Sequence, residues 1–108
     1  MNSPRDDRDL YGGLIRLHVL HHARERPIYG HWMIEELGRH GYQIGPGTMY
    51  PLLHGLTRKG YLRPKPERSG TRYRKMYRIT PSGRRALFLA RRRVRELFGE
   101  MFARRSYS

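Results

Sequence analysis

Cysteine is absent from this sequence of 108 residues, which excludes a disulfide framework and any cysteine-based zinc site. Long apolar runs are also missing, since no stretch approaches the roughly 20 apolar residues of a transmembrane helix. The opening residues MNSPRDDRDL contain no apolar core of the kind that marks a signal peptide. These absences predict a cytoplasmic protein, and its length supports one domain with a modest core.

Acidic residues are scarce: 9 Asp and Glu stand against 23 Lys and Arg, for a formal net charge of +14. Such a charge attracts polyanions, and both nucleic acids and anionic lipid surfaces are polyanionic. We find no Ser/His/Asp order, no glycine-rich phosphate loop and no paired carboxylates in a plausible cleft. The sequence therefore gives no support to an enzyme.

Hydrophobic periodicity predicts two helices before residue 42. Residues 10–26 are apolar around most of a helical circumference, which is typical of a helix covered on two sides. A shorter amphipathic helix follows the break at Pro27, and Gly41 is well placed to end it. Residues 1–9 are polar and charged, and we expect a flexible N-terminal arm there.

A third helix is expected to begin at Pro46, where the missing N–H costs nothing, and to end at Gly60. Its apolar stripe, at positions i, i+3, i+4 and i+7, consists of Met49, Leu52, Leu53 and Leu56. Pro51 lies inside this helix, although a proline there removes a hydrogen bond. The opposite face carries side chains suited to phosphates or base edges: Thr48, Tyr50, Pro51, His54 and Arg58. The second and third helices, joined by a short glycine-bearing turn, are typical of a helix-turn-helix.

Residues 61–80 predict two strands joined by a flexible turn. We expect strands at 61–63 and 73–80, and the residues expected in the turn region are Pro64, Pro66, Ser69 and Gly70. The basic residues of this hairpin are Arg63, Lys65, Arg68, Arg72, Arg74, Lys75 and Arg78. Beside a recognition helix they would bind DNA phosphates, which adds affinity more than sequence discrimination. The alternative is a merely solvated face, but so large an excess on one hairpin favours nucleic-acid binding.

A final helix is predicted from Thr80, as N-cap, and Pro81, as first helical residue. Apolar residues within it step by 3, 4, 3 and 4 and form a heptad seam: Leu87, Ala90, Val94, Leu97 and Met101. So small a chain cannot cover all of this seam, so we expect residues 81–108 to form a dimerisation helix and short tail in a symmetric homodimer. A membrane-surface role is the alternative. The arginines lie largely off the seam, which favours a partner helix over lipid.

Two segments, YGHWMIEELGRHGYQIGPGTMYPLLHGLTRKGYL and RYRKMYRITPSGRRAL, are similar to the PadR family of bacterial transcriptional regulators. The resemblance covers about residues 15–89, and its most specific part is PGTMYPLL, residues 46–53. Gly45 stands where many members carry Ser, and Tyr29 precedes Gly30 where most have His. The long final helix resembles that of the family's short subgroup.

This resemblance implies a mainly α fold with a small β-hairpin, that is, a winged helix-turn-helix at residues 10–80 followed by the dimerisation helix. It implies direct DNA contacts by Thr48 and Tyr50, with Lys75 and the hairpin arginines on phosphates. We therefore expect a dimeric, sequence-specific regulator that binds a pseudo-palindromic operator in double-stranded DNA. The resemblance also implies a repressor that a small-molecule or metal effector releases from DNA. A non-specific basic nucleic-acid-binding protein is the alternative.

Histidines supply a second set of candidates. His18 and His22 are four residues apart, as are His21 and Glu25, so either pair could face one zinc-like divalent ion. The alternative is that these are ordinary, partly buried histidines. No HExxH run or finger spacing is present, so a catalytic or finger zinc site is not expected.

A small aromatic effector is the other candidate ligand. Trp32 could stack on such a molecule, although a packing role is the more common one for a tryptophan at helical spacing. By resemblance, a ligand would lie at the dimer interface, where Leu14, Leu17 and Phe98 could line its pocket.

Overall fold

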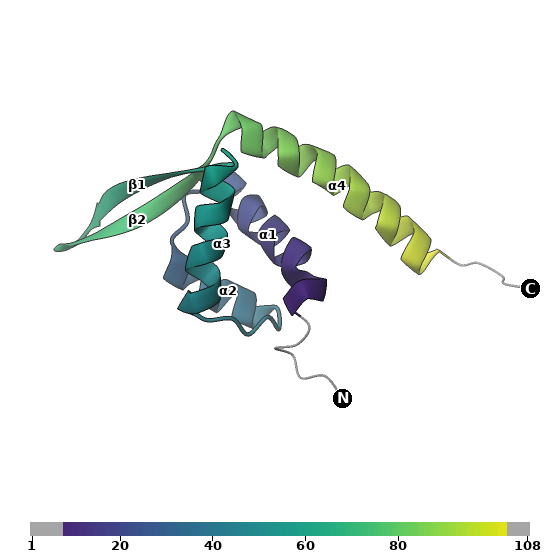
Figure 1. The fold of residues 1–108 in the computed structure, drawn as a ribbon, viewed down its shortest axis with the longest axis horizontal. Coiled ribbons are helices and arrows are strands. Elements are labelled where there is room, and N and C mark those ends of the chain that lie inside the picture. Colours follow the sequence, from purple (N-terminus) through teal and green to yellow (C-terminus); the bar gives the residue numbers. More distant parts are fainter. Residues whose placement is uncertain (1–7, 104–108) are drawn as a thin grey trace, which may run out of the picture.

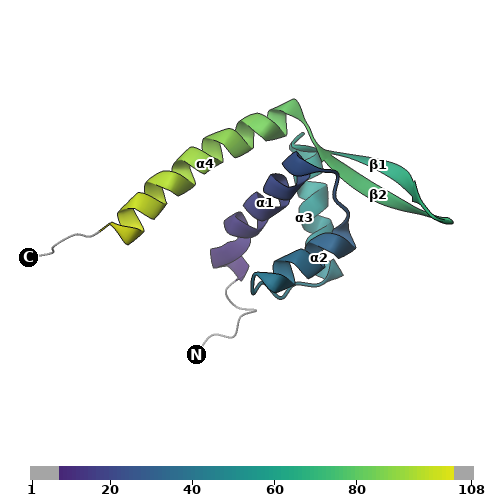
Figure 2. The same cartoon turned by 180° about the vertical axis from the view of Figure 1, so that it is seen from behind.

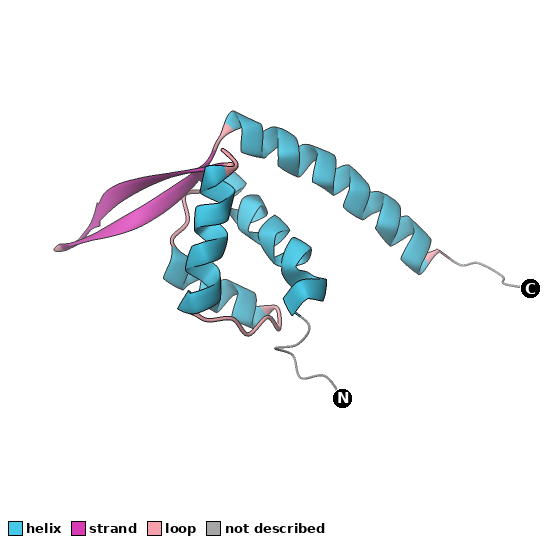
Figure 3. Ribbon diagram, viewed as in Figure 1, coloured by secondary structure: helices cyan, strands magenta, loops and turns pink. Residues whose placement is uncertain are grey.

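The structure, a computed structural model, describes residues 8–103. Its elements in order are α1 (Arg8–Glu25), α2 (Gly30–Arg39), α3 (Pro46–Arg58), β1 (Leu62–Ser69), β2 (Arg72–Ile79) and α4 (Pro81–Phe102). Figure 1 shows α1, α2 and α3 gathered together, with the hairpin extending to one side and α4 to the other. The expected mainly α fold with one antiparallel hairpin is thus confirmed, as Figure 3 shows by colour.

Helix α1 begins at Arg8, so the last two residues of the expected arm are helical. The rest of that arm, residues 1–7, and the tail at 104–108 lie outside the described residues. Within residues 8–103, no helix combines the length and the apolar character needed to cross a membrane.

The core lies where α1, α2 and α3 meet the base of the hairpin and the start of α4. Its buried side chains include Ile15, Val19, Met33, Leu37, Met49, Leu53, Leu62, Tyr77 and Leu87. Burying one such side chain stabilises the fold by about 1.5–3 kcal/mol. The stripe predicted on α3 is therefore confirmed, since all four of its residues are buried.

Glycines end both helices of the helix-turn-helix in the same way. Gly41 has a φ of +89° and Gly60 a φ of +81°, a left-handed conformation that favours glycine. After α3, the N–H of Gly60 donates to the carbonyl of Thr57 and the N–H of Tyr61 to the carbonyl of Leu56, both at 2.9 Å. These two hydrogen bonds define a Schellman motif, and Gly41 forms the equivalent one after α2.

The hairpin differs from the sequence prediction, because Pro64 and Pro66 lie within β1 and not in a turn. The register pairs Pro64 with Tyr77 and Pro66 with Lys75. The N–H and C=O of Tyr77 point away from β1 and bond to Ile28, at 2.7 and 3.0 Å. The nitrogen of Pro64 therefore faces away from β2, as does that of Pro66 two residues on. Neither proline removes a ladder hydrogen bond, so the strand continues past both.

The start of α4 is fixed against the end of α3. As predicted, Thr80 caps the helix, and its Oγ1 accepts a hydrogen bond from the N–H of Gly83 at 2.9 Å. The same hydroxyl donates to the carbonyl of Gly60. A Cβ on Gly83 would lie 2.3 Å from the carbonyl oxygen of Tyr61, so only glycine permits this approach. Beyond this junction α4 runs away from the three-helix core, as Figure 2 shows from behind.

Candidate nucleic-acid interface

Helix α3 has one buried face and one open face. Opposite its buried stripe, Tyr50 is 40% exposed, and His54 and Arg58 are exposed as well. Thr48 is half-buried, beside the start of α1, in a groove that Gly12 and Gly13 also line. The exposed side chains include hydrogen-bond donors and an aromatic ring, and a helix of this width fits the major groove of DNA.

Pro51 removes a single hydrogen bond, at a place where its loss costs little. The carbonyl of Gly45 accepts from the N–H groups of Thr48 and Met49, at 3.1 and 3.0 Å, so the first turn closes normally. The carbonyl that Pro51 leaves without its usual donor belongs to Gly47, an exposed residue in that first turn. Because only this one hydrogen bond is lost, and at an exposed residue in the first turn, the helix accommodates its internal proline.

Tyr50 combines packing with exposure. A Cβ on Gly30 would lie 2.6 Å from Cε1 of Tyr50, so the tyrosine ring rests directly on the first residue of α2. Tyr50 as a whole still keeps two-fifths of its surface in solvent. The ring therefore occupies the space that a Cβ on Gly30 would take, on the open side of α3.

The hairpin carries seven basic side chains and a single carboxylate, Glu67. Arg78 forms an ion pair with Glu67, and the other six basic side chains are exposed. Because successive residues of a strand point to opposite faces, Arg72 and Arg74 share one face of the hairpin and Lys75 lies on the other. The hairpin's basic residues that are expected to bind DNA thus lie on both of its faces.

One face of the hairpin is connected to α3 through the start of α2. The guanidinium of Arg74 lies over the ring of Tyr29, 4.3 Å from its centroid, which is a cation–π contact. Tyr29 is the N-cap of α2, and the next residue, Gly30, carries the ring of Tyr50. Arg74 and Tyr50 therefore contact two consecutive residues at the start of α2.

The heptad seam of α4 is mostly open. Leu87 is buried in the chain's own core, at 3% exposure, and Ala90 is half-buried. Val94, Leu97 and Met101 are 41%, 52% and 64% exposed. The structure thus covers the first residue of the seam and leaves its last three residues in solvent.

A cavity of about 570 Å³ lies between α1 and α4. Leu14, Leu17 and Phe98, which sequence reasoning placed around a ligand, all line it. Trp32 does not: its ring contacts that of His22, with centroids 5.3 Å apart, and the guanidinium of Arg26. Trp32 therefore has the packing role that the sequence favours for it.

The histidines separate into two groups that share His22. In one, His21 and His22 lie beside Glu25; in the other, His18 and His22 lie beside His40. Sequence reasoning missed His40, which belongs to α2's C-cap, because only the packing of α2 on α1 brings it near. The carboxylate of Glu36 is 3.1 Å from Nε2 of His40 and 3.6 Å from Nε2 of His22.

Burial and neighbouring imidazoles lower the pKa of two of these histidines. For His18, burial is the largest cause, followed by the charges of His40 and His22. For His22, burial is again the largest cause, and His21 adds to it, whereas Glu36 opposes it. The pKa of Glu36 is lowered chiefly by its hydrogen bond from Arg39. Burial thus favours the neutral form of both imidazoles.

Three helices, a basic hairpin packed beside the third helix and a polar face on that helix define a winged helix-turn-helix protein. Residues 19–88 match the model of the transcriptional regulator PadR-like family, and the chain belongs to this family. It is therefore a transcriptional regulator, and membership of the family implies DNA binding.

Individual relatives agree with this assignment. The chain is 42% identical over 101 residues to the transcriptional regulator Rv3488 of Mycobacterium tuberculosis, and the match covers 94% of each chain. A PadR family transcriptional regulator from Eggerthella lenta is 31% identical, with a TM-score of 0.73 and coverage of 90% and 88%. A PadR-like regulator from Bacillus cereus shares the fold at a TM-score of 0.76, covering 90% of this chain and 99% of that one, with 20% identity.

Proposed function

We propose that this chain is a homodimeric, sequence-specific DNA-binding repressor and that an effector weakens its binding to the operator. The observation that carries the proposal is the open face of α3, where Tyr50 is held by Gly30 beside the basic hairpin. We assign residues 10–80 to DNA binding and residues 81–108 to dimerisation. The protein would act in the cytoplasm, on double-stranded DNA.

Sequence discrimination is assigned to α3 and affinity to the hairpin. Thr48, Tyr50, His54 and Arg58 would face base edges and the adjoining phosphates in the major groove. Arg72, Arg74 and Lys75 would bind the phosphate backbone. Such contacts release counterions, so their contribution falls steeply with salt concentration.

Dimerisation is assigned to the open part of α4. Val94, Leu97 and Met101 leave a row of apolar side chains in solvent, and Phe98 and Phe102 beside them are more than 60% exposed. A second copy related by a twofold axis would cover this row. The two α3 helices would then read half-sites about 34 Å, or one helical turn, apart on one face of the DNA.

The cavity between α1 and α4 is the proposed site of an aromatic effector. Its lining combines leucines and Phe98 with Arg91 and Arg95. A planar acid would match this combination, because its ring would meet apolar walls and its carboxylate an arginine. Since α4 forms one wall, ligand binding would alter the angle between the two protomers, and with it the half-site spacing.

The test is a fluorescence-anisotropy titration of the upstream region of the protein's own gene, beside a scrambled duplex of equal length and composition. Both titrations are run at two salt concentrations, because an affinity without its salt concentration cannot be interpreted. We expect a preference for the upstream duplex that persists at the higher salt.

Equal binding of the two duplexes that collapses with salt would contradict the proposal. It would favour the alternative, a non-specific nucleic-acid-binding protein, which the net charge of +14 alone would support. Repression is tested separately, by transcription from the same upstream region in vitro with and without the protein. A rise in transcript would identify an activator.

A further inference from the structure

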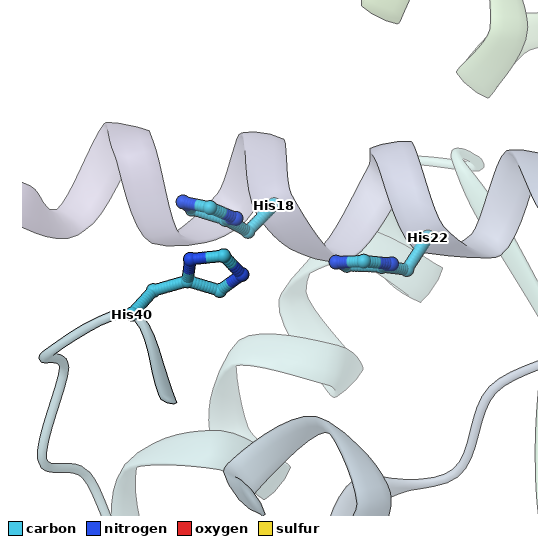
Figure 4. Close-up of side chains that lie close together, drawn as sticks. All are labelled: His18, His22 and His40. Carbon is cyan, nitrogen blue, oxygen red and sulfur yellow. The ribbon is translucent and has the colours of Figure 1, made fainter. Parts of the chain in front are cut away.

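The histidines His18, His22 and His40 converge from two different elements. His18 and His22 project from the same side of α1, one turn apart, and His40 approaches them from the end of α2 (Figure 4). Each offers a ring nitrogen, and the three nitrogens lie within 4.8 Å of one another. In a tetrahedral zinc site with Zn–N bonds of 2.0–2.1 Å, ligand nitrogens lie roughly 3.4 Å apart. Small side-chain rotations would therefore close the group around one ion.

We propose that His18, His22 and His40 bind one divalent transition-metal ion of zinc-like preference and that this ion controls the helix-turn-helix. The regulatory part of this proposal rests on the proposed function. It adds a second effector, a metal ion, and the site where that ion binds. Three imidazoles suit zinc and its neighbours in the first transition row, and not magnesium or calcium, which prefer oxygen ligands.

The surroundings of the three histidines favour a metal. Burial lowers the pKa of His18 and His22 and so favours the neutral imidazole, the form that binds a metal ion. Glu36 already lies within 3.1 Å of His40 and 3.6 Å of His22. Its carboxylate can serve as the fourth ligand or orient an imidazole that binds the ion.

The overlapping group of His21, His22 and Glu25 is the competing site. All three of its members belong to α1, and two of them are exposed. An ion there would not link α1 to any other element. His22 cannot serve both sites at once. Two histidines distinguish the competing sites: His40 belongs only to the first, and His21 belongs only to the second.

The position of His40 makes the ion regulatory. His40 lies six residues before Pro46, where α3 begins, and the intervening turn carries the left-handed Gly41. An ion held by His18, His22 and His40 would pull this turn toward α1. The start of α3, with Thr48 and Tyr50, would shift with it, so we expect metal binding to weaken operator binding.

The first experiment titrates the full, untagged chain with Zn²⁺ in a calorimeter, after a chelator has been used and removed. We expect one ion per chain. His40→Gln should weaken Zn²⁺ binding at least about a hundredfold, because it removes a ligand, and His18→Gln should do the same. His40 is exposed, so we expect its replacement to leave the fold intact, and circular dichroism would check this for each variant.

Two histidine variants serve as matched controls. His31→Gln changes an exposed histidine of α2 whose Nε2 lies 3.8 Å from a carboxylate oxygen of Glu35, and it should bind Zn²⁺ like the parent chain. His21→Gln should also retain binding within a few-fold. Parent-like binding by His40→Gln, or loss of binding in His21→Gln, would overturn the three-histidine site.

The second experiment repeats the anisotropy titration with and without saturating Zn²⁺. We expect operator affinity to fall at least tenfold with Zn²⁺ in the parent chain and to be unchanged in His40→Gln. Zn²⁺ binding with no change in operator affinity would overturn the regulatory part. If no operator preference exists, the proposed function fails, but the calorimetric result on the metal site still stands by itself.

Discussion

Helices α3 and α4 share a sequence pattern but differ in how much of their apolar stripe is buried. Each begins with a proline after its cap, and each carries an apolar stripe with basic residues elsewhere. On α3 the whole stripe is buried, whereas on α4 only Leu87 is buried and Leu97 is 52% exposed. Periodicity thus identifies the side of a helix that needs cover, but not whether the same chain supplies it.

The largest expected effect comes from placing a charge on the open stripe. Leu97→Glu should dissociate the proposed dimer, because two carboxylates would meet in an apolar seam. Two half-site contacts would become one, so operator affinity should fall by about 10²–10⁴-fold. Light scattering measures the mass, and anisotropy measures the affinity.

Arg92→Gln is the control for this change, since it alters the charge of the same helix off the seam. It should keep the dimer mass. A Leu97→Glu chain whose mass equals that of the parent would refute the seam.

Truncating one leucine in each helix distinguishes a stripe buried within the chain from one buried against a partner. Leu53→Ala should destabilise the chain by about 2–5 kcal/mol at every protein concentration, because Leu53 is buried within the chain. The cost of Leu97→Ala should instead depend on protein concentration, because a partner would provide the contact. Denaturant unfolding at two protein concentrations measures both. A concentration-independent loss in Leu97→Ala would mean that α4 folds back on its own chain.

A smaller effect is expected on the open face of α3. Tyr50→Ala should lower affinity for the operator about tenfold more than affinity for the scrambled duplex, as expected for one base contact. Tyr50→Phe is the control, because it keeps the ring on Gly30 and removes only the hydroxyl. Equal losses on both duplexes would assign Tyr50 to packing and remove it from base recognition.

The faces of α3 and the caps of α4 could be predicted from sequence because both depend on residues within one turn of each other. The stripe at Met49 and the cap at Thr80 are of this kind. The sequence predicts too short a first strand, because proline is typical of turns, whereas β1 runs from Leu62 to Ser69. Whether Pro64 disrupts a strand depends on the direction of its nitrogen, which is set by the register with Tyr77.

The grouping of the histidines could not be predicted from sequence. His18 and His22 share a helix, and their spacing of four residues is visible in the sequence. His40 joins them only through the packing of α2 on α1, and no local pattern encodes that distance. The contact of Tyr50 with Gly30, 20 residues away, could not be predicted for the same reason.

The smallest expected effect tests the core beneath both helices. The hydroxyl of Tyr77 is buried and has no hydrogen-bond partner among residues 8–103, and burial, with a contribution from Tyr50, raises its pKa. A buried hydroxyl without a partner is destabilising, so Tyr77→Phe should stabilise the fold by about 1 kcal/mol. Thermal unfolding should show a rise in Tm of about 4–8 °C for a domain of this size. A lower Tm would mean that a water molecule bonds this hydroxyl, and the core would then contain a polar site between β2 and α3.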